Sequence, residues 1–542
     1  TKGSAVETLG LTDIIGPIMV GPSSSHTAGA LRIARMAKSL LAAPPAQATF
    51  TLYGSFACTQ SGHGTDKALV AGLLGMAPDD LGIRDSFERA CEVGLEFSFA
   101  CDPSKPVEHP NTVDLHVVDQ RGDSLEVRGA SIGGGAAVIK RIDGIEVNIT
   151  GEHTSLVVRQ RDEAGVLAHI AGCVSECDVN IGTARMFRTR RGSGAYTVLE
   201  VDGALPPAVK ECIERHPAVY DVRIVAADSP AGELVDPYSP SAEEAELRFS
   251  TCEFTTGNEL LARCEEQGGS LSDAFLAREE ALAARGGHRC DAQAYLDRTL
   301  GVMRASATGP LREPVLSMGG LIGGEARAVR RSRTQETSVV DELTGCAMEY
   351  ALAVLETNAS MGRIVAAPTA GSSGVVPGVL LALEEQRGYD ADTLRRGLLA
   401  AAAVGYLIAR NATVSGAEGG CQAEVGSAAA MAAAATVEMA GGTPNQALAA
   451  AGNALCALMG LVCDPVGGLV EVPCQKRNAT AAATALVSAQ IALAGIGNLV
   501  DFDETVSTMD AVGRSLPFEL RESALGGIAA SPSACAWCEG RA

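Results

Sequence analysis

The sequence predicts an α+β protein of several domains, in which an α/β region, a βαββαβ module and an all-α region follow one another. The chain has 542 residues, and this length corresponds to about three or four domains because a domain typically holds roughly 100 to 200 residues. Short strand-like runs alternate with helical segments over the first 226 residues, whereas Ala-rich helical segments dominate beyond residue 243. We therefore expect a mixed amino-terminal part and a helical carboxyl-terminal part.

The first 150 residues contain both kinds of element. Strand-like runs occur at residues 49–53 and 115–118, and residues 28–41 form a helical segment. This mixture favours an α/β domain over residues 1–150.

Residues 151–228 carry the pattern of the βαββαβ module. Apolar periodicity indicates strands at 154–160, 179–188, 195–201 and 219–226, and helices at 166–177 and 206–215. This order of elements is the ferredoxin-like order. In the first helix, Val166, Ile170, Cys173 or Val174, and Cys177 have the three-to-four spacing of a buried face.

A stretch rich in Pro, Asp and Ser at residues 228–243 predicts a linker at 229–245, followed by an all-α domain at 246–542. The longest uncharged stretch of that domain, residues 478–500, is long enough to span a bilayer. It consists mostly of Ala with Thr, Ser, Gln and Asn, which favours a buried helix over a membrane span.

The charge and the cysteines restrict the class of protein. Lys and Arg number 43 against 65 Asp and Glu, a net charge of −22, which repels nucleic acid and anionic membrane surfaces. The 16 cysteines are irregularly spaced and no secretory hydrophobic segment is present, so we expect reduced thiols rather than a disulfide framework. We expect a cytoplasmic location, or an organelle if a leader has been removed ahead of Thr1.

Three cysteines in the helical part are candidates for binding a metal. All eight histidines precede residue 300, so sulfur would have to hold any metal there. Cys421, Cys463 and Cys474 are flanked by Gly or Pro, where thiolates can project from loops at helix ends toward one soft metal centre. The alternative is that they are small buried hydrophobic residues, as we expect for Cys346 and Cys456 within helical runs.

Two loops combine hydroxyl side chains with glycines ahead of an apolar run. One is GPSSSHT at residues 21–27 and the other is PTAGSSG at residues 368–374. Such loops can bind a carboxylate or phosphate at a helix N-terminus, and the alternative is simple helix capping. The candidate substrate-binding residues are Ser23, Ser24, Ser25, Thr27, Thr369, Ser372 and Ser373.

His63 lies in SGHGTDKA, between glycines and just before Thr65 and Asp66. A histidine in this setting can donate or accept a proton near neutral pH, and the alternative is a turn-capping or solvated side chain.

Two other motifs are too weak to assign. SIGGGAAV at residues 131–138 lacks the register of a dinucleotide loop, and Lys476 is the only lysine after Lys210, which disfavours pyridoxal phosphate chemistry.

Taken together, these motifs resemble those of the iron-sulfur-dependent L-serine dehydratases. GPSSSHTAGA and SGHGTDKA are similar to the signature of the family's small β domain, and APTAGSSGVVPGV, GGCQAEVGSAAAMAAA and GLVCDPVGGLVEVPCQKRN are similar to that of its large α domain. The resemblance spans nearly the whole chain. It implies conversion of L-serine to pyruvate and ammonia, and a 4Fe-4S cluster held by Cys421, Cys463 and Cys474 with one iron left open.

Residues 153–226 look like an ACT domain, a module that often binds amino acids and pairs with a second copy. Ala164 stands where the ACT pattern often has Pro, which weakens any claim of effector binding. We expect a homodimer because an isolated module of this kind exposes its sheet.

The resemblance also suggests roles for single residues. An open iron acts as a Lewis acid on the β-hydroxyl group, and His63, or as second choice His26, would remove the Cα proton. The hydroxyl loops, with Thr65 and Asp66, would hold the substrate. In some family members a cysteine near the C-terminus occupies the open iron until substrate displaces it. The ending SACAWCEGRA offers Cys538 for this role, with Cys535 as the alternative. The CxxC spacing also permits a redox pair, a separate metal contact or an idle tail.

Two other functions fit the same residues. One is elimination of sulfide from L-cysteine, which also yields pyruvate. The other is a non-catalytic amino-acid sensor whose cysteines are structural and bind zinc.

Overall fold

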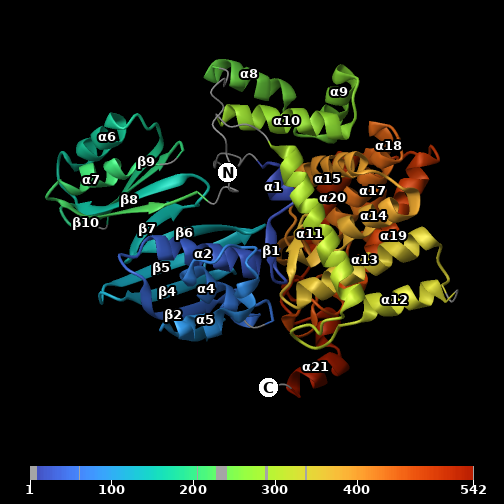
Figure 1. Cartoon of the computed structure of the whole chain (residues 1–542), viewed down its shortest axis with the longest axis horizontal. Helices are drawn as coiled ribbons and strands as arrows, with labels where there is room; N and C mark the ends of the chain where they lie inside the picture. Colours follow the sequence, from blue (N-terminus) through green and yellow to red (C-terminus); the bar gives the residue numbers. More distant parts are fainter. Residues whose placement is uncertain are drawn as a thin grey trace. The chain divides into compact units, whose positions relative to one another are not determined.

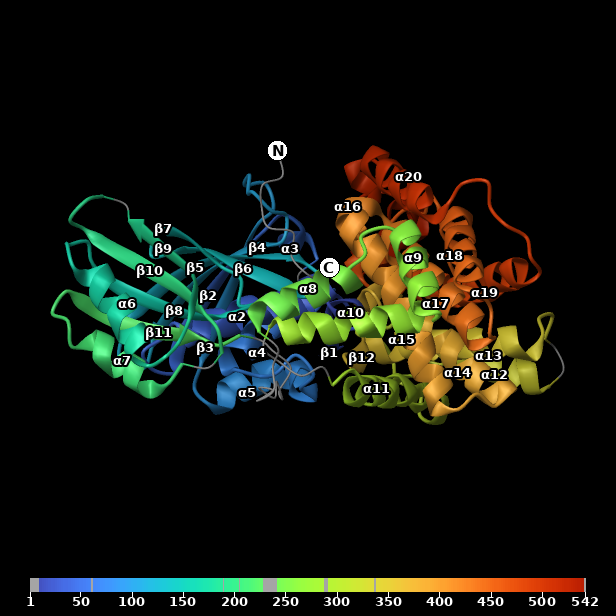
Figure 2. The same cartoon turned by 90° about the horizontal axis from the view of Figure 1, so that it is seen from above.

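The computed structural model describes residues 9–59, 62–188, 190–203, 205–227, 241–286, 291–335 and 338–540 (Figures 1 and 2). The chain forms two compact units. Unit 1 contains the N-terminal residues up to Ser24 and the residues from Glu233 onward, and unit 2 contains Ser25–Gly232. Most of the linker expected at 229–245 lies outside the described residues, and a helix begins inside it at Ala242. The mixed fold expected from the sequence, strands first and helices afterwards, is confirmed.

The larger sheet of unit 2 has six strands in the order β3-β2-β4-β5-β6-β7, of which only β2 and β3 run parallel. Helix α2 (Gly29–Ser39) packs on β5 so closely that a Cβ on Gly129 would lie 2.3 Å from Ile33 Cγ2. The segments expected at 28–41, 49–53 and 115–118 fall in α2, β2 and β4. The elements are β2 (Pro45–Tyr53), β3 (Glu96–Asp102), β4 (Thr112–Asp119), β5 (Ser124–Gly133), β6 (Ala136–Ile142), β7 (Ile145–Ile149), α3 (Gly54–Cys58), α4 (Thr65–Leu74), η2 (Leu81–Asp85) and α5 (Ser86–Glu92).

The second sheet of unit 2 is antiparallel, with the strand order β11-β8-β10-β9, and its elements follow the expected βαββαβ order. Apolar residues of helices α6 and α7 share one core with the strands, because Val166, Ile170 and Val174 lie on a single face of α6. A disulfide between Cys173 and Cys212 joins the two helices, in contrast to the reduced thiols expected from the sequence. The elements are β8 (Thr154–Arg161), α6 (Val166–Glu176), β9 (Ile181–Arg188), β10 (Gly194–Val201), α7 (Pro207–Glu214) and β11 (Val219–Val225).

Unit 1 is a helical bundle around α17 (Ser427–Met439). Every residue of this helix except Glu438 is buried, and a helix that is apolar on all sides belongs in a core. Its neighbours include α14 (Val375–Arg387), α15 (Ala391–Asn411), α18 (Pro444–Leu458) and α19 (Cys474–Leu493), which both views show around it (Figures 1 and 2). The other helices are α8 (Ala242–Cys252), α9 (Gly257–Gln267), α10 (Leu271–Arg285), α11 (Ala292–Arg312), α12 (Glu325–Thr334), α13 (Glu342–Ala359), α16 (Gly416–Gly419), α20 (Phe502–Ser515) and α21 (Pro532–Glu539).

The uncharged stretch expected to be a buried helix falls largely in α19, whose alanines are mostly buried. None of the helices in the described part of the chain is long and apolar enough to cross a membrane.

Two features of unit 1 differ from the expected all-α domain. Strand β12 (Arg363–Val365) pairs antiparallel with β1 (Ile18–Val20), so the helical unit contains a short two-stranded ribbon. The residues just before β1, with helix α1 (Leu11–Ile14), also pack on unit 1, although they were expected in the first domain. There the Leu11 amide donates to Glu279 (2.7 Å) and the Tyr295 hydroxyl donates to the carbonyl of Ile15 (2.5 Å). Burial of Leu11, Ile14 and Ile15 explains this placement.

Candidate functional site

Cys421, Cys463 and Cys474 lie at the ends of helices in unit 1, as expected. Cys421 precedes the π-helix η4 (Gln422–Gly426), Cys463 follows α18, and Cys474 is the first residue of α19. All three are buried. Gln422 connects the segment of Cys421 to the segment of Cys463 by two hydrogen bonds. Its backbone N–H donates to the carbonyl of Leu461 (2.9 Å), and its side-chain oxygen accepts from the backbone N–H of Gly460 (2.8 Å).

The surroundings of these cysteines disfavour an uncompensated thiolate. The pKa of Cys463 is raised by its hydrogen bond with Cys421 and by burial, and the pKa of Cys474 is raised by burial and by the charge of Cys421. Arg477 supplies positive charge nearby and is held by Asp464 and the carbonyl of Val462, both at 2.8 Å. A cationic group bound by the sulfurs would compensate the charge that burial disfavours.

The spacing of the three sulfurs does not suit a single metal ion. Around one zinc, sulfur ligands would lie about 3.8 Å apart, yet within the described residues these three atoms are not all within 4.8 Å of one another. The described part of unit 1 contains no histidine that could add a nitrogen ligand. Three buried sulfurs are a donor set of the kind that soft metal centres take.

Glu424 connects these cysteines to the second hydroxyl loop. Its Oε1 accepts a hydrogen bond from Thr369 Oγ1 (2.9 Å), and its Oε2 lies 3.7 Å from Cys463 Sγ. A Cβ on Gly416 would lie 2.4 Å from the same carboxylate, so a larger residue there would displace the Glu424 side chain. Burial raises the pKa of Glu424, and the hydrogen bonds from Thr369 and Cys463 oppose this effect.

Asn478 makes a second connection between the loop and the cysteines. Its side-chain oxygen accepts from the amide of Gly374 (3.0 Å), and its nitrogen donates to the carbonyls of Gly371 and Cys474, both at 2.9 Å. The structure therefore brings the loop at 368–374 together with the predicted metal-binding cysteines.

The hydroxyls of this loop do not cap the helix that follows. Gly374 is the N-cap of α14 and no side-chain cap hydrogen bond forms there. Ser372 shares a hydrogen bond with Thr369 (3.0 Å), while the buried Ser373 hydroxyl has no partner in the described part of the chain. A buried hydroxyl without a partner is costly, and a bound ligand would relieve this cost.

The C-terminal helix α21 lies against the loop between Cys463 and Cys474. A Cβ on Gly467, where φ is +60°, would lie 3.0 Å from Trp537 Cζ3 and 3.5 Å from Cys538 Sγ. Cys535 is exposed, and its Sγ is 4.0 Å from the carbonyl of Ala529. Of the two tail cysteines, Cys538 is therefore the one that lies against the Gly467 loop, which connects the predicted ligands Cys463 and Cys474.

In unit 2, His26 and His63 form a buried pair. Their ring centroids are 4.5 Å apart in an edge-on arrangement, and His26 Nε2 lies 2.8 Å from Ser55 Oγ. Neither ring nitrogen of His63 has a hydrogen-bond partner in the described part of the chain. Burial lowers the pKa of His63 to about 4, and burial with the nearby His63 and His109 lowers that of His26. Both imidazoles are therefore neutral at pH 7 and able to accept a proton.

The first hydroxyl loop forms the π-helix η1 (Ser24–Ala28) ahead of α2, and no side-chain cap hydrogen bond forms at the start of α2. Ser23, Ser24 and Thr27 are buried and Ser25 is half-buried. Thr27 Oγ1 donates to the carbonyl of His63 (2.7 Å), which joins this loop to SGHGTDKA.

Thr65 is buried and its hydroxyl has no partner in the described residues. Asp66 is half-buried, accepts from the amide of Lys67 (2.8 Å) and has its pKa raised by burial. Of the predicted residues of unit 2, His26 and Thr27 are the ones that the structure brings into contact with His63.

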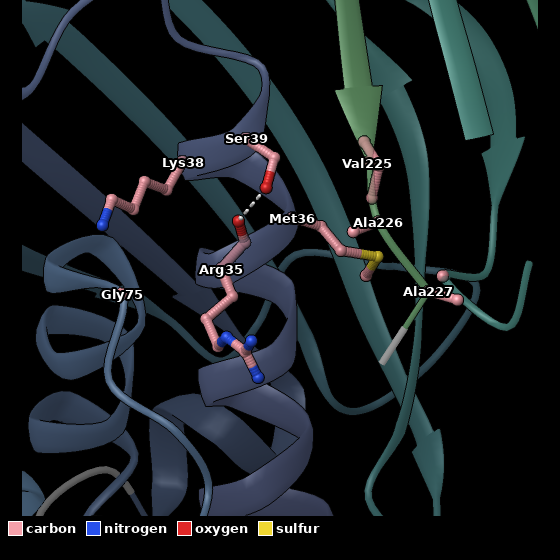
Figure 3. A pocket seen from close by; sticks show the side chains of 9 residues that line it. Arg35, Met36, Lys38, Ser39, Gly75, Val225, Ala226 and Ala227 are labelled. Atoms are coloured by element: carbon pink, nitrogen blue, oxygen red, sulfur yellow. Dashed lines mark hydrogen bonds between the residues drawn. The ribbon is translucent and has the colours of Figure 1, made fainter. Parts of the chain in front are cut away.

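Unit 2 also contains a cavity of about 270 Å³ that none of the predicted site residues lines. It lies between α2 and the end of β11, with Arg35, Lys38 and Val225 in its wall (Figure 3). Lys38 Nζ donates to the carbonyl of Leu74 (3.0 Å), so this cation is already partnered.

Sequence reasoning missed Glu424, Asn478 and Arg477. Glu424 follows Cys421 by three residues in EGGCQAEVG and is an isolated acid in a run of Gly and Ala, which was the available signal. Arg477 and Asn478 end the motif that contains Cys474, in a segment where polar side chains interrupt an Ala-rich helix.

Comparison with known proteins identifies two regions of the chain. The family model of the serine dehydratase alpha chain matches residues 255–529, and that of the serine dehydratase beta chain matches residues 11–96.

Some individual relatives match one region of this chain, and others match nearly all of it. The L-serine dehydratase alpha chain of Peptoniphilus asaccharolyticus is 44% identical over 280 residues, covering 51% of this chain and 94% of the relative. The beta chain of the same organism is 38% identical over 201 residues, covering 37% of this chain and 90% of the relative. The L-serine dehydratase of Streptomyces coelicolor is 32% identical over 538 residues, covering 96% of this chain and 98% of the relative. The chain therefore belongs to the L-serine dehydratase family and combines regions similar to its alpha and beta chains in one polypeptide.

Proposed function

We propose that this protein is a lyase that converts L-serine to pyruvate and ammonia by β-elimination of water. The observation that carries the proposal is the hydrogen-bonded path from Thr369 through Glu424 to Cys463, which joins a hydroxyl loop to buried sulfurs. Membership of the L-serine dehydratase family supports the same substrate.

Cys421, Cys463 and Cys474 would hold a 4Fe-4S cluster. When bound, the cluster supplies a Lewis acid at its open iron, which makes the β-hydroxyl of serine a better leaving group. The buried all-sulfur donor set and the nearby guanidinium of Arg477 support this assignment.

The hydroxyl loop of unit 1 would bind the substrate carboxylate. Ser373 offers a buried donor without a partner in the described chain, and Thr369 and Ser372 lie beside it. Asn478 bonds the middle and the end of this loop, at Gly371 and Gly374, so the donors are oriented before substrate arrives. Fixed donors of this kind need no reorganisation when the substrate binds.

His63 would remove the Cα proton. It is neutral at pH 7 and neither ring nitrogen is occupied within the described chain, whereas His26, the second candidate, is engaged with Ser55. Thr27 positions the backbone of His63, and Ser23, Ser24, Ser25, Thr65 and Asp66 are the further candidates for contacting the substrate. Loss of the proton and the hydroxyl leaves aminoacrylate, which tautomerises and hydrolyses to pyruvate and ammonia.

We further propose Cys538, rather than Cys535, as the tail cysteine that covers the open iron in the resting enzyme. The contact of Cys538 with the Gly467 position supports this choice. We also propose that the chain consists of a β-type domain (1–150), an ACT-like domain (151–228), a linker (229–245) and an iron-sulfur domain (246–542), and that it forms a homodimer. Two of these bounds are adjusted by the fold, because the residues up to Ser24 belong to unit 1 and helix α8 begins at Ala242.

The decisive experiment is an assay of pyruvate release from L-serine, with L-cysteine in parallel, by protein reconstituted anaerobically with iron and sulfide. We expect pyruvate from L-serine and loss of this activity after exposure to air. Cys421→Ser is the control and should lose both iron and activity, while Cys456→Ser, which changes an exposed cysteine of α18, should keep both. A brown protein with an intact cluster that releases no pyruvate from L-serine would refute the proposal. Release from L-cysteine alone would identify a desulfidase instead.

A further inference from the structure

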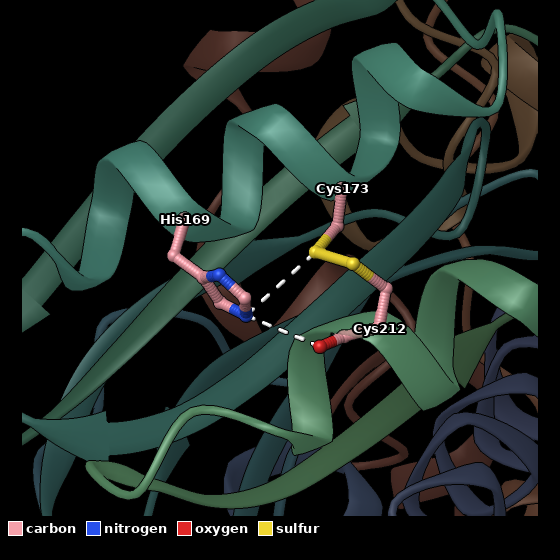
Figure 4. Close-up of side chains that lie close together, drawn as sticks. All are labelled: His169, Cys173 and Cys212. Carbon is pink, nitrogen blue, oxygen red and sulfur yellow. Dashed lines mark hydrogen bonds between the residues drawn. A yellow bond between two sulfur atoms is a disulfide. The ribbon is translucent and has the colours of Figure 1, made fainter.

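A cluster of sulfur and imidazole groups joins the two helices of the βαββαβ module, separate from the residues proposed for catalysis. Cys173 on α6 and Cys212 on α7 form the disulfide, and His169 lies one turn before Cys173 (Figure 4). His169 Nε2 is 3.6 Å from Cys173 Sγ and 3.1 Å from the carbonyl oxygen of Cys212. The two sulfurs and one ring nitrogen of His169 all lie within 4.8 Å of one another.

The fold explains why these atoms converge. Residues four apart on a helix lie on the same face, so His169 and Cys173 both point from α6 toward the sulfur that α7 presents (Figure 4). Cys173 is buried, while His169 and Cys212 are half-buried. The cluster is therefore shielded on the core side and reachable from solvent on the other.

We propose that reduction of the Cys173–Cys212 disulfide converts this cluster into a binding site for a thiophilic divalent cation such as Zn²⁺, with Cys173, Cys212 and His169 as the protein ligands. Two thiolates and one imidazole are a donor set that zinc accepts, with water in the fourth position. In a tetrahedral zinc site the ligand atoms lie about 3.4 to 3.8 Å apart. The distance of 3.6 Å between His169 Nε2 and Cys173 Sγ already falls in this range.

The chemical steps balance with a dithiol as reductant. The dithiol transfers two electrons and two protons to the protein disulfide, which becomes two thiols, and the dithiol becomes a disulfide. Metal binding then releases the two thiol protons to water, because the thiolate is the ligand. The His169 Nε2–H group now donates to the carbonyl of Cys212. Binding requires the other tautomer, with the proton on Nδ1, and so this hydrogen bond is given up.

The proposed site makes the module responsive to both redox state and metal. The disulfide holds α6 to α7 in the oxidised protein, and the cation would hold them in the reduced protein. Only the reduced, metal-free protein would have neither the disulfide nor the cation between the two helices, and the hydrogen bond from His169 to the carbonyl of Cys212 would be the link that remains at this point. The inference concerns this module alone and does not depend on L-serine turnover.

The test uses the full-length, iron-loaded protein under anaerobic conditions. The protein is treated with a phosphine reductant, incubated with Zn²⁺ and gel-filtered, and zinc and iron per chain are then measured. We expect the reduced wild type to retain one zinc per chain more than Cys173→Ser, with equal iron, and the unreduced wild type to retain no additional zinc. Equal zinc in the reduced wild type and in Cys173→Ser would overturn the proposal.

Two further variants separate a metal site from a purely structural disulfide. His169→Ala keeps both cysteines and should form the disulfide as the wild type does, but the Kd for zinc of its reduced form should rise at least about tenfold. Cys177→Ser is the matched control, because Cys177 directly follows α6 and its sulfur lies outside the cluster, and this variant should bind zinc as the wild type does. An unchanged Kd in His169→Ala would also overturn the proposal, and this variant decides the matter if Cys173→Ser does not fold.

Discussion

Thr369 Oγ1 donates a 2.9 Å hydrogen bond to Glu424 Oε1, although 55 residues separate the two in the sequence. The other oxygen of the same carboxylate lies 3.7 Å from Cys463 Sγ. Glu424 therefore lies between the loop proposed to bind the substrate carboxylate and a sulfur proposed to bind iron. A change in this hydrogen bond is expected to affect both.

The first prediction concerns this hydroxyl. Thr369→Val removes the donor and leaves a buried carboxylate oxygen without its partner, which should lower the free energy of unfolding by about 1 to 3 kcal/mol. Thermal unfolding and iron content per chain measure the effect, and both should fall. Thr369→Ser keeps the hydroxyl and is the matched control. A valine variant as stable and as rich in iron as the serine variant would contradict the role given to Glu424.

The second prediction concerns Asn478, whose side chain bonds Gly374, Gly371 and Cys474. Asn478→Ala removes all three hydrogen bonds from a buried position, so the free energy of unfolding should fall by about 2 to 4 kcal/mol. We expect KM for L-serine to rise as well, because the loop loses its fixed orientation. Thr480→Ala serves as the control, since Thr480 is exposed on the same helix and its hydroxyl donates to the carbonyl of Lys476 within that helix. If both variants behave alike, Asn478 does not organise the loop.

Local periodicity was enough to predict most of the fold. The βαββαβ module follows from strands and helices long enough to show their own repeat, such as α6 with its buried face of Val166, Ile170 and Val174. The ribbon of β1 and β12 could not be predicted in this way. Each strand has three residues, too few to show alternation, and the two are far apart in the sequence. The packing of Leu11 and Ile15 on unit 1 likewise depends on contacts that no local pattern records.

The candidate site was predictable only where a residue type is chemically distinctive. Cysteines beside Gly or Pro, and histidine between glycines, can be recognised from the sequence alone. Glu424 and Asn478 are ordinary polar residues whose roles arise from partners far away in the chain, such as Thr369 and Gly371. The Cys173–Cys212 disulfide was not expected because 39 residues separate its members and no spacing rule relates them.

The third prediction concerns the C-terminal tail. The wild type should show a lag before steady-state pyruvate release, and Cys538→Ser should remove this lag and change the Mössbauer spectrum of the resting cluster, because the tail sulfur no longer covers the open iron. Cys535→Ser should leave both unchanged, since Cys535 is exposed and points toward the carbonyl of Ala529. Iron content should equal that of the wild type in both variants. An unchanged lag and spectrum in Cys538→Ser would eliminate this cysteine as the tail ligand.

The fourth prediction assigns the general base. His63→Gln should lower kcat for L-serine by about 10² to 10⁴-fold, the range typical of a lost acid–base group. KM and iron content should stay close to the wild-type values, because the substitution leaves the hydroxyl loop and the cysteines intact. His116→Gln is the matched control, since His116 is exposed on β4 of the same unit. If His26→Gln loses more activity than His63→Gln, the base is His26.

The fifth prediction concerns stability in acid. Burial lowers the pKa of His63 from 6.5 to about 4, so between these two values the unfolded chain binds a proton that the folded chain does not. Acid therefore favours unfolding across this window, and stability falls as the pH drops from 6.5 toward 4. The loss attributable to this group is about 3 kcal/mol, at 1.36 kcal/mol for each pKa unit. Urea unfolding at pH 7, 6, 5 and 4.5, compared between wild type and His63→Gln, measures it. The variant should show the shallower dependence on pH, and His116→Gln should match the wild type. Equal slopes in wild type and His63→Gln would show that His63 is not buried in the neutral form.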